Sequence, residues 1–126
     1  MVTGTWTGTD TLSGGGKCKL AGGVDSVTNP VRMVWTVHED GDVTILLPDW
    51  PGVYPYSFYG KVNPDLSVEL VLTTSALCNT TQHSFSVGFE SQIQQDGDGY
   101  RLELVGDETW CPLLCTFQRR YEVGKE

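Results

Sequence analysis

Positive charge is scarce in this sequence. Only 8 of its 126 residues are Lys or Arg, against 16 Asp or Glu, so the formal net charge is -8 at pH 7. A surface with this balance repels phosphate backbones and anionic bilayers within a Debye length. We therefore expect neither a nucleic acid nor a membrane surface as a partner.

Long hydrophobic runs and helical periodicity are also missing. No stretch approaches the roughly 18 to 20 apolar residues of a membrane-spanning helix, so membrane insertion is not expected. Apolar residues recur instead at every second position, which is the period of a half-buried strand. Hydrophobic residues still make up 39% of the chain and aromatic residues 10%. This is enough apolar material for one domain over residues 1–126 to pack its own core.

Side chains suited to catalysis at neutral pH are few. The two histidines, His38 and His83, do not stand beside a Ser or Cys nucleophile in a recognisable motif. The sequence DGDG at 96–99 carries oxygen ligands for calcium, but it is much shorter than an EF-hand loop and lacks the distal Glu. We interpret it as a hairpin turn. We assign no catalytic residue, no metal site and no cofactor, and whether the protein is an enzyme stays open.

Four cysteines, Cys18, Cys78, Cys111 and Cys115, suggest an oxidising environment. An even number in a small Gly-rich and Thr-rich domain favours two disulfides, and therefore a secreted, extracellular or periplasmic protein. Of the three possible connectivities we favour Cys18 with Cys78 and Cys111 with Cys115, because the last two are near neighbours. A zinc site with four thiolates is the alternative, but it usually has two close pairs and this chain has one.

The alternating pattern predicts eight strands. They cover about residues 4–12, 31–39, 43–47, 56–62, 68–75, 83–93, 100–106 and 116–123. A Gly-rich loop is expected at 13–30, and hairpin turns at Asp40-Gly41, at Asn63-Pro64-Asp65 and at 94–99. A sandwich and a barrel both fit this count. We favour an all-β, eight-stranded antiparallel up-and-down barrel, because closing the sheet removes its exposed edges.

Alternation places the large apolar side chains on one face of the sheet. Closing the sheet turns this face into a lining with few charges. A barrel of eight strands is either filled by such side chains or holds one small ligand, and both outcomes stay open. The expected inward-facing residues are Met33, Trp35, Val37, Val43, Ile45, Leu47, Phe85, Val87, Phe89, Tyr100, Leu102 and Leu104.

The segment 47–60 combines aromatic rings with three prolines, which stiffen a loop. It suits a portal at the mouth of the barrel, where rings offer contact area at a low cost in entropy. An equally weighted alternative is a lid that folds back over the core. The rings belong to Trp50, Tyr54, Tyr56, Phe58 and Tyr59.

The first strand opens with Gly4-Thr5-Trp6, which resembles the Gly-x-Trp start of the calycin superfamily, including lipocalins and avidins. In lipocalins this Trp packs across the closed end of the barrel against an Arg of the last strand. The resemblance therefore implies a barrel in which Trp6 is a plug that receives a cation–π contact from Arg119 or Arg120. The chain departs from these families in lacking a Thr-Asp-Tyr motif, a terminal helix and the polar set that holds biotin. The resemblance implies architecture and leaves the ligand unspecified.

Three classes of function follow. The first is an exported protein that holds a small, mostly apolar molecule in its barrel, with one hydrogen bond from a tyrosine or Arg119. The second is a small-barrel enzyme, similar to a cyclase, whose cavity confines the substrate. The third is an interaction or inhibitor module that presents its aromatic segment to a protein partner. The ligand-binding residues expected for the first are Met33, Trp35, Trp50, Tyr54, Tyr56, Phe58, Phe85, Phe89, Tyr100 and Arg119.

Overall fold

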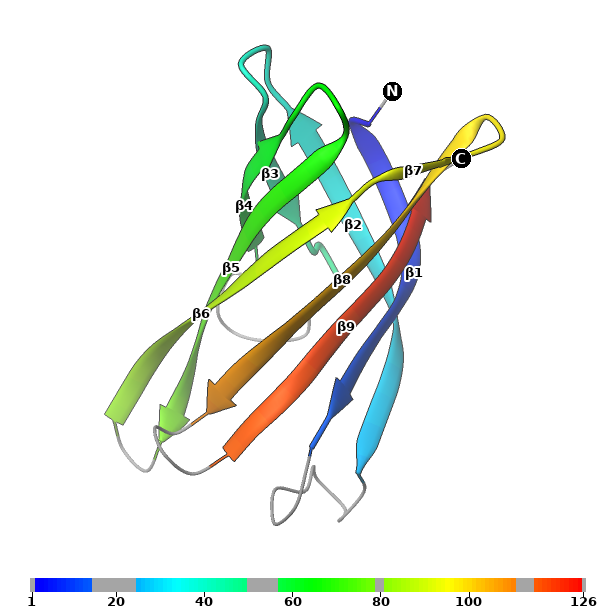
Figure 1. Ribbon diagram of the computed structural model, residues 1–126. Coiled ribbons are helices and arrows are strands. Elements are labelled where there is room, and N and C mark those ends of the chain that lie inside the picture. Colours follow the sequence, from blue (N-terminus) through cyan, green and yellow to red (C-terminus); the bar gives the residue numbers. More distant parts are fainter. Residues whose placement is uncertain (1, 15–24, 50–56, 79–80, 111–114, 126) are drawn as a thin grey trace.

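The chain forms a nearly closed antiparallel barrel (Figure 1). The computed structural model describes residues 2–14, 25–49, 57–78, 81–110 and 115–125, with side chains except at 74–85, 108–110 and 115. One sheet has the order β6-β5-β4-β3-β2-β1-β9-β8-β7, so the all-β barrel prediction is confirmed. The strands are β1 (Gly4–Ser13), β2 (Ser26–Val37), β3 (Asp42–Leu46), β4 (Ser57–Val62), β5 (Ser67–Cys78), β6 (Thr81–Gln92), β7 (Gln94–Asp96), β8 (Gly99–Trp110) and β9 (Cys115–Lys125).

The predicted count of eight strands is wrong by one, because the chain bends at Ile93. Ile93 is only 2% exposed, and its backbone N–H donates to the carbonyl of Leu66 rather than to a ladder partner. Before this bend β6 pairs with β5, and after it β7 pairs with β8. Because the ladder partner changes at Ile93, residues 94–96 form the separate strand β7, although the sequence predicts them as part of a turn.

The predicted loop at 13–30 is shorter than expected. β2 begins at Ser26 and pairs with β1 down to the last residues of that strand. Pro30 lies opposite Thr9, on a stretch of β2 that has β1 as its only ladder partner among the described residues. A proline is tolerated there because its missing N–H does not interrupt a second ladder.

The predicted hairpin turns at Asp40-Gly41 and at Asn63-Pro64-Asp65 are confirmed. The turn predicted at 94–99 is shorter than expected, because residues 94–96 form β7 and only residues 97–98 connect it to β8. All three turns lie at the same end of the barrel (Figure 1). Gly41 and Gly97 have φ of 89° and 62°, which a side chain disfavours. In the turn between β4 and β5, Leu66 takes a φ of 68°, and its N–H donates to the carbonyl of Asn63. Both chain termini lie at this end too (Figure 1).

The barrel closes between β6 and β8 without a ladder. The hydroxyl of Ser91 donates to the carbonyl of Glu103 at 2.6 Å, which joins the two strands. A Cβ at Gly106 would lie 2.6 Å from Cγ1 of Val87 and 2.8 Å from the Phe89 ring, so β8 passes very close to the inner face of β6. A glycine at 106 therefore allows the seam to close by side-chain packing.

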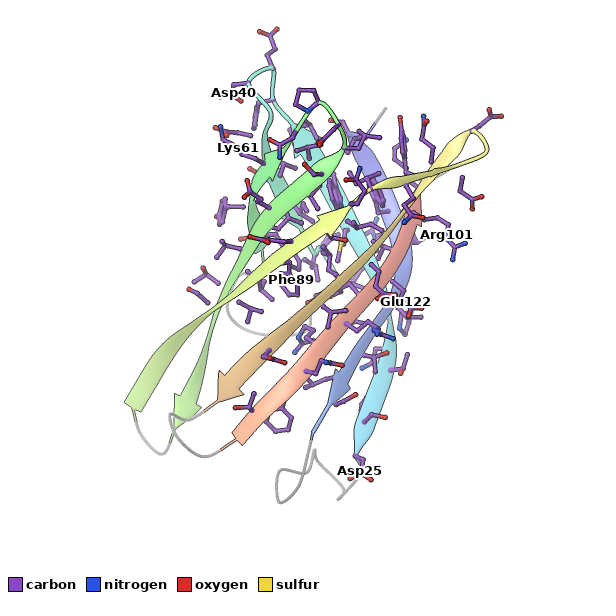
Figure 2. All side chains as sticks on the ribbon, in the orientation of Figure 1. Asp25, Asp40, Lys61, Phe89, Arg101 and Glu122 are labelled. Atoms are coloured by element: carbon purple, nitrogen blue, oxygen red, sulfur yellow. The ribbon has the colours of Figure 1, made fainter. Side chains whose placement is uncertain are left out.

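Aromatic rings fill the half of the barrel near the hairpin turns. Trp6 stacks on Trp35 with ring centroids 4.6 Å apart, and on Tyr100 at 6.1 Å. A second group joins Phe58, Phe89 and Tyr121 with centroids 5.3 to 6.1 Å apart, and Phe89 points into the barrel (Figure 2). We call this half, with its two ring groups, the closed half. The other core residues are Met33, Val43, Ile45, Leu47, Val68, Leu70, Leu72, Val87, Ile93, Leu102, Leu104 and Val123.

Candidate functional site

The wall of the barrel is incomplete away from the hairpin turns. β3 pairs with β2 only at residues 34–37, and β4 pairs with β5 only up to Thr73. Beyond those residues, β2 at 26–33 and β5 at 74–78 have no strand between them in the part of the chain that the structure describes. The described strands therefore surround one half of the barrel, whereas in the other half no described strand lies between β2 and β5.

The inner face of β2 changes from buried to exposed along the strand. Trp35 and Met33 are fully buried, whereas Asn29 and Val27, which share their face by alternation, are exposed. Val27 is 38% exposed although it points toward the barrel axis, and it pairs with Leu12 of β1. Solvent therefore reaches the inner surface at this end, which carries Asp25 in Figure 2. We call the inner surface formed by Leu12, Val27, Asn29 and Phe117 the open half.

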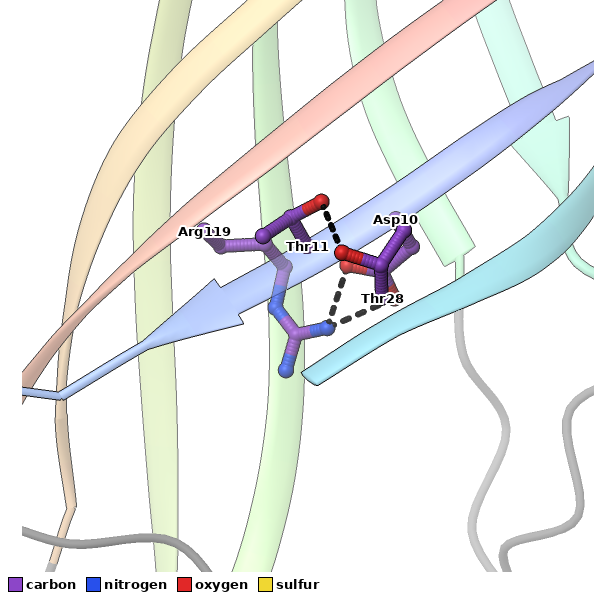
Figure 3. A network of polar contacts seen from close by, with 4 residues as sticks. All are labelled: Asp10, Thr11, Thr28 and Arg119. Carbon is purple, nitrogen blue, oxygen red and sulfur yellow. Dashed lines mark hydrogen bonds and ion pairs between the residues drawn. The ribbon is translucent and has the colours of Figure 1, made fainter. Parts of the chain in front are cut away.

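An ion pair lies between the two halves. Arg119 of β9 reaches diagonally across the ladder to Asp10 of β1 (Figure 3). Its Nη1 donates to both carboxylate oxygens, at 2.9 and 2.7 Å, and the side chains are only 4% and 9% exposed. Removing two charges from water costs several kcal/mol each, so each charge here depends on the other.

The surroundings of the ion pair differ on its two sides. Toward the closed half, the guanidinium carbon of Arg119 lies 6.0 Å from the centre of the Tyr121 ring, which belongs to the second ring group. Toward the open half, the next inward-facing residue of β9 is Phe117, which is 6% exposed. The pair therefore forms a polar floor beneath an inner surface that is mostly apolar.

The expected contact between Trp6 and an arginine is wrong. Arg119 and Arg120 lie opposite Leu12 and Thr11 in the ladder, five or six residues along β1 from Trp6. At about 3.4 Å per residue, this distance is too large for a cation–π contact. Arg120 lies on the outer face, where its nitrogens are 3.7 Å from Glu103 and Glu122.

Trp6 is nevertheless the plug that the sequence predicts. It is fully buried, and its Nε1–H donates to the carbonyl of Val2 at 2.9 Å. Its ring neighbours are Trp35 and Tyr100 rather than an arginine. A stacked aromatic group therefore closes this end of the barrel.

The predicted ligand-binding residues fall into three groups. Met33, Trp35, Phe58 and Phe89 are buried in the closed half at 0 to 2% exposure, and half-buried Tyr100 packs against them. Arg119 alone borders the open half, and the ligand contacts of all six stay a prediction. The residues outside the described structure are Trp50, Tyr54, Tyr56, Cys18 and Cys111, together with the side chains of Phe85, Cys78 and Cys115. The disulfides therefore stay a prediction as well.

Sequence reasoning missed Asp10, Leu12, Val27 and Phe117. A signal for the ion pair was present, because Asp10 shares the alternation of Trp6 and Leu12 in β1. Arg119 likewise stands between the inward-facing Phe117 and Tyr121. The first and last strands of the chain therefore each carry one charged residue at an inward position. Opposite charges at such positions indicate a buried ion pair, since a lone buried charge is very costly.

Other polar features lie on the outer surface. Two shallow clefts of about 760 and 750 Å³ share Arg101 and Gly124, and Arg101 and Glu122 point outward in Figure 2. The pKa of Asp49 lies below its ordinary value because Arg32 donates two hydrogen bonds to it at the exposed surface.

Among the described residues, no cluster of His, Cys, Asp or Glu is arranged to hold a metal ion, and no helix is long and apolar enough to cross a membrane. The open half is therefore the candidate site.

The comparisons with known proteins add no relative. No protein family matches the chain, and no curated protein or solved structure is significantly similar to it.

Proposed function

We propose that this protein binds a small, mostly apolar molecule in the open half of its barrel. The observation that carries the proposal is the 38% exposure of Val27, an apolar side chain on the inner face of the sheet. Inward-facing apolar surface that water reaches is the part of a barrel that a ligand can cover with a gain in free energy.

The shape and chemistry of the open half support this proposal. Leu12, Val27 and Phe117 supply apolar contacts, and the Asp10–Arg119 pair supplies one polar anchor at the floor. Binding sites for small molecules combine these two features, a mostly apolar lining and a few fixed polar groups.

The architecture also agrees with the resemblance of Gly4-Thr5-Trp6 to the calycin opening. A nearly closed barrel with a buried tryptophan at one end is what that resemblance implies. We therefore extend the proposal to a calycin-type carrier that is exported and stabilised by disulfides. In this proposal Trp50, Tyr54 and Tyr56, which lie outside the described residues, belong to the portal that the sequence predicts.

Two valines provide a matched test. Val27 is 38% exposed and faces inward, whereas Val105 of β8 is 39% exposed and faces outward by alternation. We would titrate the wild type, Val27→Asp and Val105→Asp with the uncharged fluorophore N-phenylnaphthylamine, whose emission rises in apolar surroundings. The expected results are saturable binding to the wild type, at least about tenfold weaker binding to Val27→Asp, and little change for Val105→Asp.

Folding of both variants is checked by circular dichroism and by Tm, since both substitutions are at exposed positions. Val27→Trp is a second inner variant that fills the space without adding charge, and it should also weaken binding. Equal effects of Val27→Asp and Val105→Asp would place the probe elsewhere. The absence of saturable binding to the wild type would contradict the proposal directly.

A further inference from the structure

We infer that the open half selects an uncharged ligand over an anionic one, and that Asp10 sets this preference. The inference rests on the proposed function and deepens it, because it names the charge class of the bound molecule. The observation behind it is that the arginine at the floor of the site already has a buried counter-ion on the neighbouring strand.

The ion pair is electrically neutral as a unit. Both oxygens of Asp10 accept from Nη1 of Arg119, at 2.9 and 2.7 Å, and both side chains are at least nine-tenths buried. A carboxylate ligand placed beside the pair would bring a second negative charge into a poorly solvated place that holds one positive charge. Such an excess charge is strongly unfavourable at low effective dielectric.

In the part of the chain that the structure describes, no other cation is placed to compensate the excess. Among the described residues below the second ring group, Arg119 is the only Lys or Arg that alternation directs to the inner face. Arg32 lies outside and pairs with Asp49 at 2.8 Å, and Arg120 lies outside between two glutamates. The net charge of -8 adds a long-range repulsion of anions.

An uncharged head group avoids this cost. An amide or hydroxyl group presents a hydrogen-bond donor to the carboxylate of Asp10 and adds no charge to the floor. The rest of the molecule then covers the apolar side chains of the open half. The chemistry therefore indicates a neutral amphipathic molecule, such as an alcohol or an amide of a hydrocarbon chain or ring.

Isosteric probes separate charge from shape. Naphthalene carboxamide and naphthalene carboxylate have the same ring and nearly the same head group, and dodecanamide and dodecanoate form a second pair. Near pH 7 both carboxylates are ionised. We would measure their affinity for the full chain by displacement of N-phenylnaphthylamine. The wild type should bind each amide at least about tenfold more tightly than its carboxylate.

Asp10→Asn tests the role assigned to Asp10. It removes the negative charge that Asp10 places beside Arg119, so the carboxylates should gain about tenfold or more while the amides change little. Glu122→Gln on the outer face removes the same formal charge and should leave the preference unchanged. The double variant Asp10→Asn with Arg119→Gln has a neutral floor again and should lose the gain in carboxylate affinity.

The outcomes distinguish the two proposals. If the carboxylates bind the wild type as tightly as the amides, the inference on charge is wrong although the site exists. An unchanged preference in folded Asp10→Asn, or an equal change in Glu122→Gln, would overturn the role of Asp10. If no member of either pair displaces the fluorophore and the fluorophore itself does not bind, the proposed function fails and the inference fails with it.

Discussion

The closed half and the open half are built from the same strands, yet among the described inward-facing side chains of β2 the exposed ones lie in the open half. β1 contributes Trp6 to the closed half at 0% exposure and the less buried Leu12 to the open half. β2 likewise changes from buried Trp35 to exposed Val27 on one face. The strands that differ are β3 and β4, because their described residues do not extend beside the open half. Alternation therefore sets which way a side chain points, and the length of neighbouring strands sets whether it is covered.

The largest contrast between the halves should appear in the cost of truncating one inward side chain. Phe58 is fully buried against Phe89 and Tyr121, so Phe58→Ala should lower the free energy of unfolding by about 3–5 kcal/mol. Val27→Ala in the open half should change it by no more than about 0.5 kcal/mol. Denaturant titration measures both values. Similar losses at the two positions would show that the open half is packed as well.

At the boundary between the halves, removing one charge of the Asp10–Arg119 pair should destabilise the protein more than removing both charges. Arg119→Met removes the guanidinium group that pairs with the buried carboxylate of Asp10 and should cost about 3–5 kcal/mol. Replacing Asp10 with Leu in the same chain removes the buried charge, and the double variant should recover most of this loss. Denaturant titration at neutral pH measures the coupling between the two sites. Additive losses would argue that the two side chains act independently.

Within the closed half, the two stacked tryptophans should not be equivalent. Nε1 of Trp6 donates to the carbonyl of Val2, whereas the buried Nε1 of Trp35 has no hydrogen-bond partner among the described residues. Trp6→Phe removes an N–H group that makes a hydrogen bond, whereas Trp35→Phe removes a buried N–H group for which the described residues provide no acceptor. Trp6→Phe should therefore destabilise the protein by about 1 kcal/mol more than Trp35→Phe. Equal losses in thermal unfolding would indicate that the Trp35 N–H has found an acceptor, such as a buried water.

The sequence predicts the fold better than it predicts the site, for a physical reason. Period-two alternation and turn residues are local signals, and they place Met33, Phe89 and Leu104 in the core and the hairpin at Asp40-Gly41 as observed. The bend at Ile93 depends on a hydrogen bond to Leu66, which lies 27 residues earlier, so alternation alone does not reveal β7.

The candidate site depends on long-range pairing still more strongly. Asp10 and Arg119 are 109 residues apart and meet only because β1 and β9 are neighbours in the sheet. Alternation within the last strand is enough to predict that Arg119 points inward. Predicting that it pairs with Asp10 also requires knowing that β1 and β9 are neighbours in the sheet. The 38% exposure of Val27 depends likewise on its surroundings in the folded sheet, which alternation within β2 does not reveal.

The smallest expected effect concerns a turn at the closed end, where Asp65 caps the connection between β4 and β5. Its Oδ1 accepts from the Ser67 hydroxyl at 2.6 Å and from the Ser67 N–H at 3.0 Å, and these bonds lower the pKa of Asp65 below its ordinary 3.8. A carboxylate with a lowered pKa in the folded state stabilises the fold above its ordinary pKa, and this contribution disappears as the pH falls through the lowered value. Asp65→Asn should therefore give a slightly lower Tm at pH 7, and the difference from the wild type should close as the pH falls through the lowered pKa of Asp65. Ser67→Ala removes the hydroxyl donor, so Asp65→Asn should cost less in that background. A Tm difference that persists at pH 2 would mean that the turn depends on the shape of Asp65 rather than on its charge.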